Sequence, residues 1–284
     1  MITVLESINL STQYLIQKGI ESSRINAELL LADILDCKRL DLYLSFDKPL
    51  GNQEIEKYRD YIRRRGNFEP IQYITGKVDF YGIELKVNSS VLIPRPETEL
   101  LVENILKVLS RDKESTILDI GCGSGNITIA LAVNLSSSKF ICTDNSDEAL
   151  KVAKENAEKY FELERIKFIN HNILKEDLNN FPQFDIIVSN PPYVSRKDFK
   201  SVQKEIRDYE PRSAVTDDSD GYTFFREITR KSFNKIKSGG KLFFEVAEGQ
   251  DERVIEIMKK NNFKNITVIK DYQNIDRIIF GEAG

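Results

Sequence analysis

The sequence predicts an α/β fold in which a mostly parallel sheet follows a small helical domain. From about Glu97 onward, helical and strand-like apolar patterns alternate along the chain, which is typical of parallel strands joined by crossover helices. Residues 3–66 instead carry apolar side chains at helical spacing. The 284 residues are enough for one large domain and one small one.

We expect the N-terminal helical domain to span residues 1–70. One helical face carries Glu28 and Asp33, and the other carries apolar residues at helical spacing, which predicts a solvated side and a buried side. The apolar residues are Ala27, Leu30, Leu31, Ile34 and Leu35. A later helix ends near Arg63–Arg65, the only dense basic cluster in the chain. Because cations favour a helix C-terminus, we interpret this cluster as a solvated helix end.

Residues 71–95 are expected to form a β-hairpin linker, because apolar residues alternate there around Gly76 and Gly82. Residues 96–284 would then form the large domain. Its closing strands are expected at 241–246, 266–270 and 277–280, with a helix at 250–261.

A glycine-rich turn follows the first predicted strand of the large domain. The strand at 115–120 contains Asp119 and a buried helix is expected at 126–133. Between them lie Gly121, Cys122, Gly123, Ser124 and Gly125. Such a strand, glycine turn and helix N-terminus let the backbone approach a ligand closely. The next strand, 139–143, is followed by Asp144, about twenty residues past the glycines, where an acid can bind ribose hydroxyls.

This turn differs from a nicotinamide or flavin site, which needs G-x-G-x-x-G, because Asn126 occupies the third glycine position. The pattern G-x-G-x-G, flanked by Asp119 and Asp144, resembles the cofactor loop of class I S-adenosylmethionine methyltransferases. That resemblance implies S-adenosylmethionine as cofactor and a Rossmann-like, mostly parallel seven-stranded sheet. The alternative is a tight βα turn of an unrelated α/β domain.

A second motif, Asn190-Pro191-Pro192-Tyr193, follows the apolar strand at 184–189. Proline fixes its own φ and restricts the preceding residue, so the segment is stiff and extended. The Asn190 side-chain oxygen and the Pro191 carbonyl can each accept one hydrogen of an –NH2 group. Tyr193 would pack against a flat target group or simply fill the core. The alternative for the whole motif is an ordinary strand-ending turn.

Both motifs and Asp144 follow predicted strands directly, so they are expected at one edge of a parallel sheet, where such folds bind ligands. A methyl donor would then lie beside the amino group held by Asn190. The combination resembles the amino-methyltransferases, which modify exocyclic base amines or side-chain amides.

Further segments indicate a single family within the amino-methyltransferases. They are Pro70–Gly76, Phe80–Gly82, Pro94–Val102, Tyr209–Val215 and Asp220–Gly221. In this order, over most of residues 22–281, they are similar to the bacterial peptide-chain release-factor glutamine methyltransferases. The resemblance implies methylation of the glutamine side-chain nitrogen in the Gly-Gly-Gln motif of translation release factors, with the helical domain docking the protein substrate.

One departure from many relatives concerns the adenine contacts. The chain has no tryptophan, and Asn172 and Ile173 stand where an aromatic residue is often found, after a strand at 165–170. We therefore expect Asn172 and Ile173 at the cofactor. Two alternatives stay open: a DNA adenine amino-methyltransferase, whose flipped base could occupy the same clamp, and a non-catalytic cofactor-binding regulator.

Composition sets the remaining expectations. Lys and Arg total 41 against 45 acidic residues, a net charge of −4, so we expect no stable nucleic-acid partner. His171 is the only histidine, which excludes a histidine triad or histidine-rich metal site, and it is assigned no role. Three cysteines without a C-x-x-C pair indicate a reducing cytoplasm, and no stretch is apolar enough for a membrane span. We expect a monomer.

Overall fold

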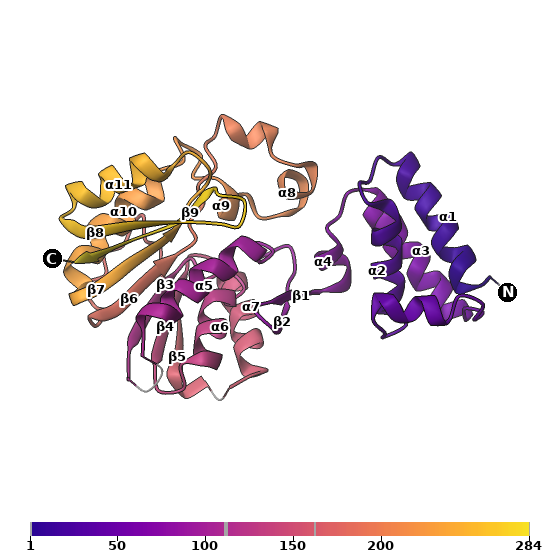
Figure 1. The fold of residues 1–284 in the computed structure, drawn as a ribbon, viewed down its shortest axis with the longest axis horizontal. Helices are drawn as coiled ribbons and strands as arrows, with labels where there is room; N and C mark the ends of the chain where they lie inside the picture. The colour runs from indigo at the N-terminus through magenta and orange to yellow at the C-terminus, as the bar shows by residue number, and fades with distance from the viewer. Residues whose placement is uncertain (1, 111–112, 162, 284) are drawn as a thin grey trace. The chain divides into compact units, whose positions relative to one another are not determined.

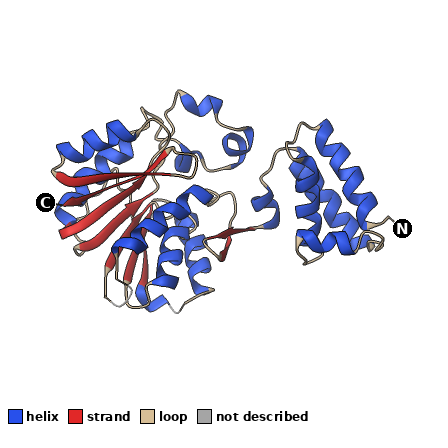
Figure 2. Cartoon of the chain, viewed as in Figure 1, coloured by secondary structure: helices blue, strands red, loops and turns tan. Residues whose placement is uncertain are grey.

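The computed structural model describes residues 2–110, 113–161 and 163–283, which fall into two compact units, Met1–Lys77 and Val78–Gly284. Figures 1 and 2 show a first unit made of helices and a second unit in which helices flank a sheet. Within the described residues, every helix is too short or too polar to cross a membrane.

The first unit packs its helices around one apolar core that includes Ile8, Leu30, Leu31 and Tyr58. Its elements are α1 (Val4–Gln17), α2 (Ser23–Ile34), the 3₁₀ helix η1 (Arg39–Leu44), α3 (Asn52–Gly66) and α4 (Ile71–Thr75). A Cβ on Gly66 would lie 2.7 Å from the Tyr14 ring, so this glycine lets the end of α3 approach α1 closely.

Two charged side chains of this unit are buried where the sequence pattern predicted solvent exposure. Glu28 is 1 % exposed because Arg24, Arg39 and Tyr43 all donate hydrogen bonds to its carboxylate, at 2.8–3.0 Å. Arg65 is 6 % exposed and donates to the carbonyl of Glu69 at 3.0 Å. The arginine cluster is therefore only partly a solvated helix end.

The range 71–95 is divided between the two units. Tyr73 and Ile74 lie in α4, and Ile74 belongs to the core of the helical unit. The hairpin itself comprises β1 (Lys77–Phe80) and β2 (Ile83–Lys86). Lys86 exchanges two backbone hydrogen bonds with the Asn156 side chain, at 2.7 and 2.9 Å, which attach the hairpin to the second unit.

The second unit contains a seven-stranded sheet of order β5-β4-β3-β6-β7-β9-β8. Its strands are β3 (Thr116–Ile120), β4 (Lys139–Asp144), β5 (Ile166–Asn170), β6 (Phe184–Ser189), β7 (Ile236–Glu245), β8 (Phe263–Lys270) and β9 (Asp276–Ala283). Only β9 runs antiparallel to its two neighbours in this sheet. The predicted α/β class with a mostly parallel sheet is confirmed.

Helices cover both faces of the sheet, as Figure 1 shows. One face packs against α5 (Pro96–Val108), α6 (Asn126–Asn134) and α7 (Asp147–Glu158), and the other against α10 (Thr223–Ser232) and α11 (Asp251–Lys260). Successive strand residues supply alternate faces: Ile186 and Val188 pack on the first, Ile187 on the second. This two-sided burial explains the continuous apolar run of β6.

The remaining elements are short helices between the strands. They are η2 (Leu163–Arg165), η3 (Asp198–Ser201), α8 (Lys204–Tyr209), α9 (Arg212–Val215) and η4 (Phe233–Lys235). The chain moves outward from β3 through β4 to β5 and then returns to place β6 on the other side of β3. This reversal of strand order is the position at which open parallel sheets bind ligands.

Candidate active site

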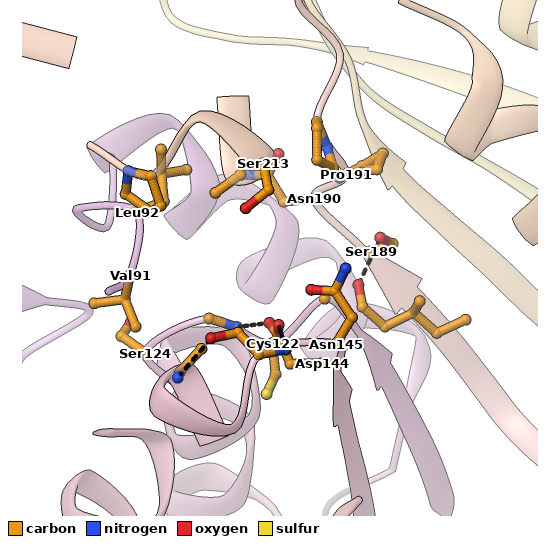
Figure 3. A pocket seen from close by; sticks show the side chains of 18 of the residues that line it. Val91, Leu92, Cys122, Ser124, Asp144, Asn145, Ser189, Asn190, Pro191 and Ser213 are labelled. Atoms are coloured by element: carbon orange, nitrogen blue, oxygen red, sulfur yellow. Dashed lines mark hydrogen bonds between the residues drawn. The ribbon is translucent and has the colours of Figure 1, made fainter. Parts of the chain in front are cut away.

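A cavity of about 310 Å³ opens at the carboxyl ends of β3, β4 and β6. Figure 3 shows Leu92, Ser213 and Pro191 across the cavity from Ser124, Cys122 and Asp144. The predicted site residues that line it are Gly121, Cys122, Gly123, Ser124, Asp144, Asn172, Ile173, Asn190, Pro191 and Pro192. The fold therefore brings together segments that are up to 71 positions apart in sequence, Gly121 and Pro192 being the extremes.

The glycine turn is open toward the cavity. Gly121 and Gly123 have φ of +75° and +53°, which favour glycine, and a Cβ on either would meet no protein atom within 4 Å. The amides of Gly121 and Cys122 both donate to the Thr143 carbonyl, at 2.8 and 3.0 Å, which fixes the turn against β4. Gly121 and Gly123 thus form a cradle whose free space a side chain would fill.

Gly125, the third glycine of the turn, lies apart from the cavity. Its φ is +80° and a Cβ there would lie 3.2 Å from Ala153 and from Ile129. It is buried beneath the turn and lies outside the cavity lining. The third glycine therefore permits close packing against α7, while the first two face the cavity.

Asp144 is held by the same turn. Its Oδ2 accepts a hydrogen bond from the Gly123 amide and its Oδ1 accepts one from the Ser146 amide, both at 3.0 Å. Burial raises the pKa of Asp144, and these hydrogen bonds oppose the shift. Each carboxylate oxygen has further lone-pair capacity, and the side chain lines the cavity. It can therefore accept hydrogen bonds from vicinal hydroxyls, as a ribose offers.

Asp119 lies below the cavity rather than in its lining. It is fully buried, and its Oδ2 accepts a 2.9 Å hydrogen bond from the Thr128 hydroxyl on α6. In the part of the chain that the structure describes, its Oδ1 has no hydrogen-bond partner. Burial raises the pKa of Asp119 to about 7. An orphaned buried oxygen beside the glycine turn marks a place where a donor from a ligand or a water would be stabilising.

The Asn-Pro-Pro-Tyr loop is fixed on both sides. Before it, the Ser189 hydroxyl donates to the Ile120 carbonyl at 2.7 Å, joining the ends of β6 and β3. After it, the Gln250 side-chain amide donates to the Tyr193 carbonyl at 3.0 Å. Asn190 itself donates from Nδ2 to the Thr98 hydroxyl oxygen at 3.2 Å. Asn190 and Pro191 therefore have defined positions at the cavity wall.

Tyr193 lies outside the cavity lining. Its ring is partly buried and packs against the apolar core on the α10 and α11 side of the sheet. Burial raises the pKa of its hydroxyl, and the nearby charge of Glu245 adds to that shift. Of the two roles considered for Tyr193, the structure places the side chain where core filling requires it.

Two loops that complete the cavity wall are joined by Glu210. Its carboxylate is almost fully buried, accepts a 3.2 Å hydrogen bond from the Ile93 amide and pairs with the Arg95 guanidinium. Residues around these two anchors line the cavity: Val91, Leu92, Pro94 and Arg95 on one side, and Pro211, Ser213 and Ala214 on the other. Glu210 therefore ties together two wall segments that come from different parts of the chain.

Both units of the chain are similar to known proteins. Residues 6–76 match the family model described as the PrmC N-terminal domain, and residues 96–208 match the methyltransferase small domain. A release factor glutamine methyltransferase from Geobacter sulfurreducens is 36 % identical over 282 residues, covering 99 % of this chain and 97 % of the relative. The chain belongs to the release factor glutamine methyltransferase family. The similarity extends over both units.

Other family members agree with this assignment. A release factor glutamine methyltransferase from Flavobacterium psychrophilum is 42 % identical over 247 residues, covering 85 % of each chain. Among solved structures, a methyltransferase from Pyrococcus furiosus aligns with a TM-score of 0.52 at 16 % identity, covering 72 % of this chain and 90 % of that one. The hMettl16 catalytic domain, solved with an RNA hairpin, aligns with a TM-score of 0.57 at 14 % identity and covers 82 % of each chain. These two structures show the shared fold.

Some site residues of this family member were not predicted from its sequence. His171 lines the cavity, its amide donates to the Asp144 carbonyl at 2.9 Å, and burial lowers the pKa of its imidazole. Its Nε2 is buried without a hydrogen-bond partner among the described residues. Thr98 and Arg95 also line the cavity. Both lie in the segment Pro94–Val102, which the family resemblance had singled out without giving either residue a role.

Proposed function

We propose that this enzyme transfers a methyl group from S-adenosylmethionine to the side-chain nitrogen of the glutamine in the Gly-Gly-Gln motif of translation release factors. The observation that carries the proposal is the position of Asn190 and Pro191 on the wall of the cavity that Gly121, Gly123 and Asp144 also line. Family membership supports the same substrate. Because release factors act in translation, we also infer a cytoplasmic location.

The cavity residues suit the cofactor. The space above Gly121 and Gly123 would take the methionine portion and the sugar, and Asp144 would accept hydrogen bonds from the ribose hydroxyls. Asn172 and Ile173, with His171 beside them, would border the adenine. When bound, S-adenosylmethionine supplies a methyl group activated by its sulfonium.

Asn190 and Pro191 would orient the target amide. An amide nitrogen is a poor nucleophile because its lone pair is delocalised into the carbonyl. With one hydrogen bonded to the Asn190 Oδ1 and the other to the Pro191 carbonyl, the nitrogen is held in place and its pyramidalisation is favoured. Orientation of this kind contributes several kcal/mol to a rate enhancement. Transfer would break the methyl–sulfur bond and form a nitrogen–carbon bond, leaving the amide nitrogen with one extra, strongly acidic proton. Water can take up this proton, so no side chain has to act as a strong base in this scheme.

The helical unit would dock the protein substrate. Most large apolar side chains that stay exposed in the described residues belong to this unit, although it is the smaller one. They include Ile25 and Leu29, one turn apart on α2, and Leu40 and Leu44 on η1. Exposed apolar side chains of this kind are typical of a protein-binding surface rather than of a nucleic-acid-binding one.

The test is methyl transfer from labelled S-adenosylmethionine, offered in parallel to a release factor, to its Gln→Ala variant in the Gly-Gly-Gln motif, and to duplex DNA. We expect label on the wild-type factor alone. Label on DNA would favour an adenine amino-methyltransferase, and label on none of the three would refute the substrate assignment.

The variant Asn190→Ala tests the proposed clamp, which consists of the Asn190 side chain and the Pro191 carbonyl. Loss of one aimed hydrogen bond at such a site typically costs on the order of 10²–10³ in rate. We expect turnover to fall by about this factor while the affinity for S-adenosylmethionine, measured by calorimetry, changes little. Near-normal turnover by Asn190→Ala would rule out the proposed clamp.

A further inference from the structure

The Asn190 side chain is one end of a hydrogen-bond chain that leads into the protein interior. Its Nδ2 donates to the Thr98 hydroxyl oxygen at 3.2 Å, and the Thr98 hydroxyl donates to the Glu245 carboxylate at 2.6 Å. Thr98 is in the first turn of α5, and Glu245 is the last residue of β7. Because Ser189 pairs with Phe244 across the parallel strands, the next residues, Asn190 and Glu245, are level with each other.

When Glu245 is ionised, the hydrogen bonds from Asn190 through Thr98 to Glu245 can run in only one donor-to-acceptor direction. A carboxylate only accepts hydrogen bonds, so the single Thr98 hydroxyl hydrogen must point to Glu245. Thr98 can then offer only a lone pair to Asn190, and Asn190 must turn its NH2 group toward Thr98. Its Oδ1 is left as the acceptor at the cavity wall, where no donor among the described residues is bonded to it. An amide rotated by 180° would place two donors at the wall instead.

The burial of Glu245 makes this arrangement costly. The Glu245 side chain is 1 % exposed, and the attraction of Arg277 for its charge is opposed by the like charge of Glu97. The Asn190 side chain also hydrogen-bonds Glu245 directly, which likewise requires its NH2 group to face the carboxylate. A hydrophobic residue would fill the same space at lower cost in folding free energy. Glu245 hydrogen-bonds Thr98, and Thr98 holds Asn190. The presence of a buried acid here is therefore better explained by its effect on Asn190 than by a contribution to folding stability.

We propose that Glu245 and Thr98 are positioning residues that select the amide rotamer of Asn190 in which Oδ1 faces the methyl acceptor. The inference rests on the proposed function, because it assumes that the acceptor is an –NH2 group. Thr98 and Glu245 both lie outside the Asn-Pro-Pro-Tyr loop, and their role would be to make the Asn190 side chain accept a hydrogen bond at the cavity wall. Neither residue needs to touch the methyl donor for this effect.

The first test compares kinetics of Thr98→Val, Thr98→Ser and Glu245→Gln in the full-length enzyme. Thr98→Val removes the hydroxyl link, and Thr98→Ser keeps it. Glu245→Gln retains the shape but can either donate to or accept from Thr98, so the direction is no longer fixed. The matched control is Thr229→Val, the same substitution at a fully buried hydroxyl of α10 that lies outside the cavity lining.

We expect Thr98→Val to lower kcat by roughly tenfold to a hundredfold, as misplacement of an orienting group does, while KM for the release factor stays near the wild-type value. Glu245→Gln should lower kcat less, since one of its two arrangements is productive. Thr98→Ser and Thr229→Val should retain wild-type kcat. Unchanged kcat in Thr98→Val, or a rise in KM alone, would overturn the proposal.

A second readout does not depend on the methyl transfer reaction. The Asn190 side-chain NH2 signal in a ¹H–¹⁵N spectrum can be assigned by its loss in Asn190→Asp. In wild type, Thr98→Ser and Thr229→Val, one of its hydrogens should be protected from exchange by the bond to Thr98. In Thr98→Val that protection should weaken, because only the direct contact of Asn190 with Glu245 remains. If the signal is the same in Thr98→Val and wild type, Asn190 is held by something else and the inference fails, whatever substrate the enzyme methylates.

The two readouts separate the two hypotheses. If wild-type enzyme does not methylate the release factor but the Asn190 signal responds to Thr98→Val, the substrate assignment fails and the positioning chain stands. If the release factor is methylated and the signal does not respond, the positioning chain fails and the proposed function stands.

Discussion

Thr98 and Glu245 are 147 positions apart in the sequence, and a 2.6 Å hydrogen bond joins the hydroxyl of one to the carboxylate of the other. Both are buried, and the bond links the first turn of a helix to the last residue of a central strand. Whether Glu245 is ionised or protonated decides which groups donate and which accept in the hydrogen bonds that lead to Asn190. Activity should therefore depend on the protonation of Glu245.

The rate of methyl transfer should fall as the pH is lowered through 7. Burial raises the pKa of Glu245 to about 7, although the hydrogen bond from Thr98 and the charge of Arg277 oppose the shift. Below that pH the protonated acid can donate a hydrogen bond to Thr98. The Thr98 hydroxyl can then donate to the Asn190 Oδ1, which turns the amide so that its NH2 group faces the cavity. In Glu245→Gln this step in the kcat profile should be absent. A wild-type profile that is flat between pH 6 and pH 8 would contradict the prediction.

Asp119→Asn should stabilise the protein at alkaline pH. The folded-state pKa of Asp119 is raised to about 7 by burial, against an ordinary value of 3.8, so the folded state binds the proton more tightly than the unfolded state. Stability from this group is complete below the unfolded pKa and is lost as the pH rises toward 7. The gain in Tm of Asp119→Asn should therefore be absent near pH 4, grow up to about pH 7 and then level off. A gain that is independent of pH would point to a packing effect.

Gly123→Ala should weaken cofactor binding. Gly123 has a φ of +53° and faces the cavity, so the methyl group of an alanine would occupy space that S-adenosylmethionine is proposed to fill. We expect the Kd for S-adenosylmethionine, measured by calorimetry, to rise by more than about tenfold. Gly239→Ala is the control, because Gly239 also has a positive φ and open space but lies outside the cavity lining. Both variants should lose stability from backbone strain, and equal binding by the two would show that strain alone is responsible.

Glu210→Ala should destabilise the fold by about 1–3 kcal/mol, since the buried Ile93 amide loses its acceptor. Because the two cavity-wall loops are then no longer tied together, KM for the cofactor should also rise. The exposed pair between Arg207 and Asp208 offers a control, and Asp208→Ala should change the free energy of unfolding by less than about 1 kcal/mol. Urea denaturation compares the two variants directly.

The sequence predicted much of the second unit because its strands are apolar on both faces and end in recognisable turns. The strands ending at Ile120, Asp144 and Ser189 all occur within a residue of their predicted ends. Side-chain alternation and glycine or proline at the strand ends are local signals, and they survive in the fold. The cofactor loop and the Asn-Pro-Pro-Tyr loop meet at one edge because the strands are parallel.

Other features depend on partners far away in the sequence. Glu28 and Arg65 look like surface residues by helical pattern, yet each is buried by groups that the pattern of one helix cannot reveal. Glu245 follows an apolar run and has no local sign of a role. Asp119 and Gly125 belong to the expected motif, but only packing against Thr128 and Ala153 shows that they support the turn from below.

The order of these segments along the chain has a consequence for biosynthesis. The clamp residue Asn190 leaves the ribosome before β7, and its anchor Glu245 is the last residue of that strand. Until β7 pairs with β6, the amide of Asn190 has no partner to select its orientation, even if the cofactor turn is already folded. Nascent chains that end before β7 therefore lack the contact that orients Asn190.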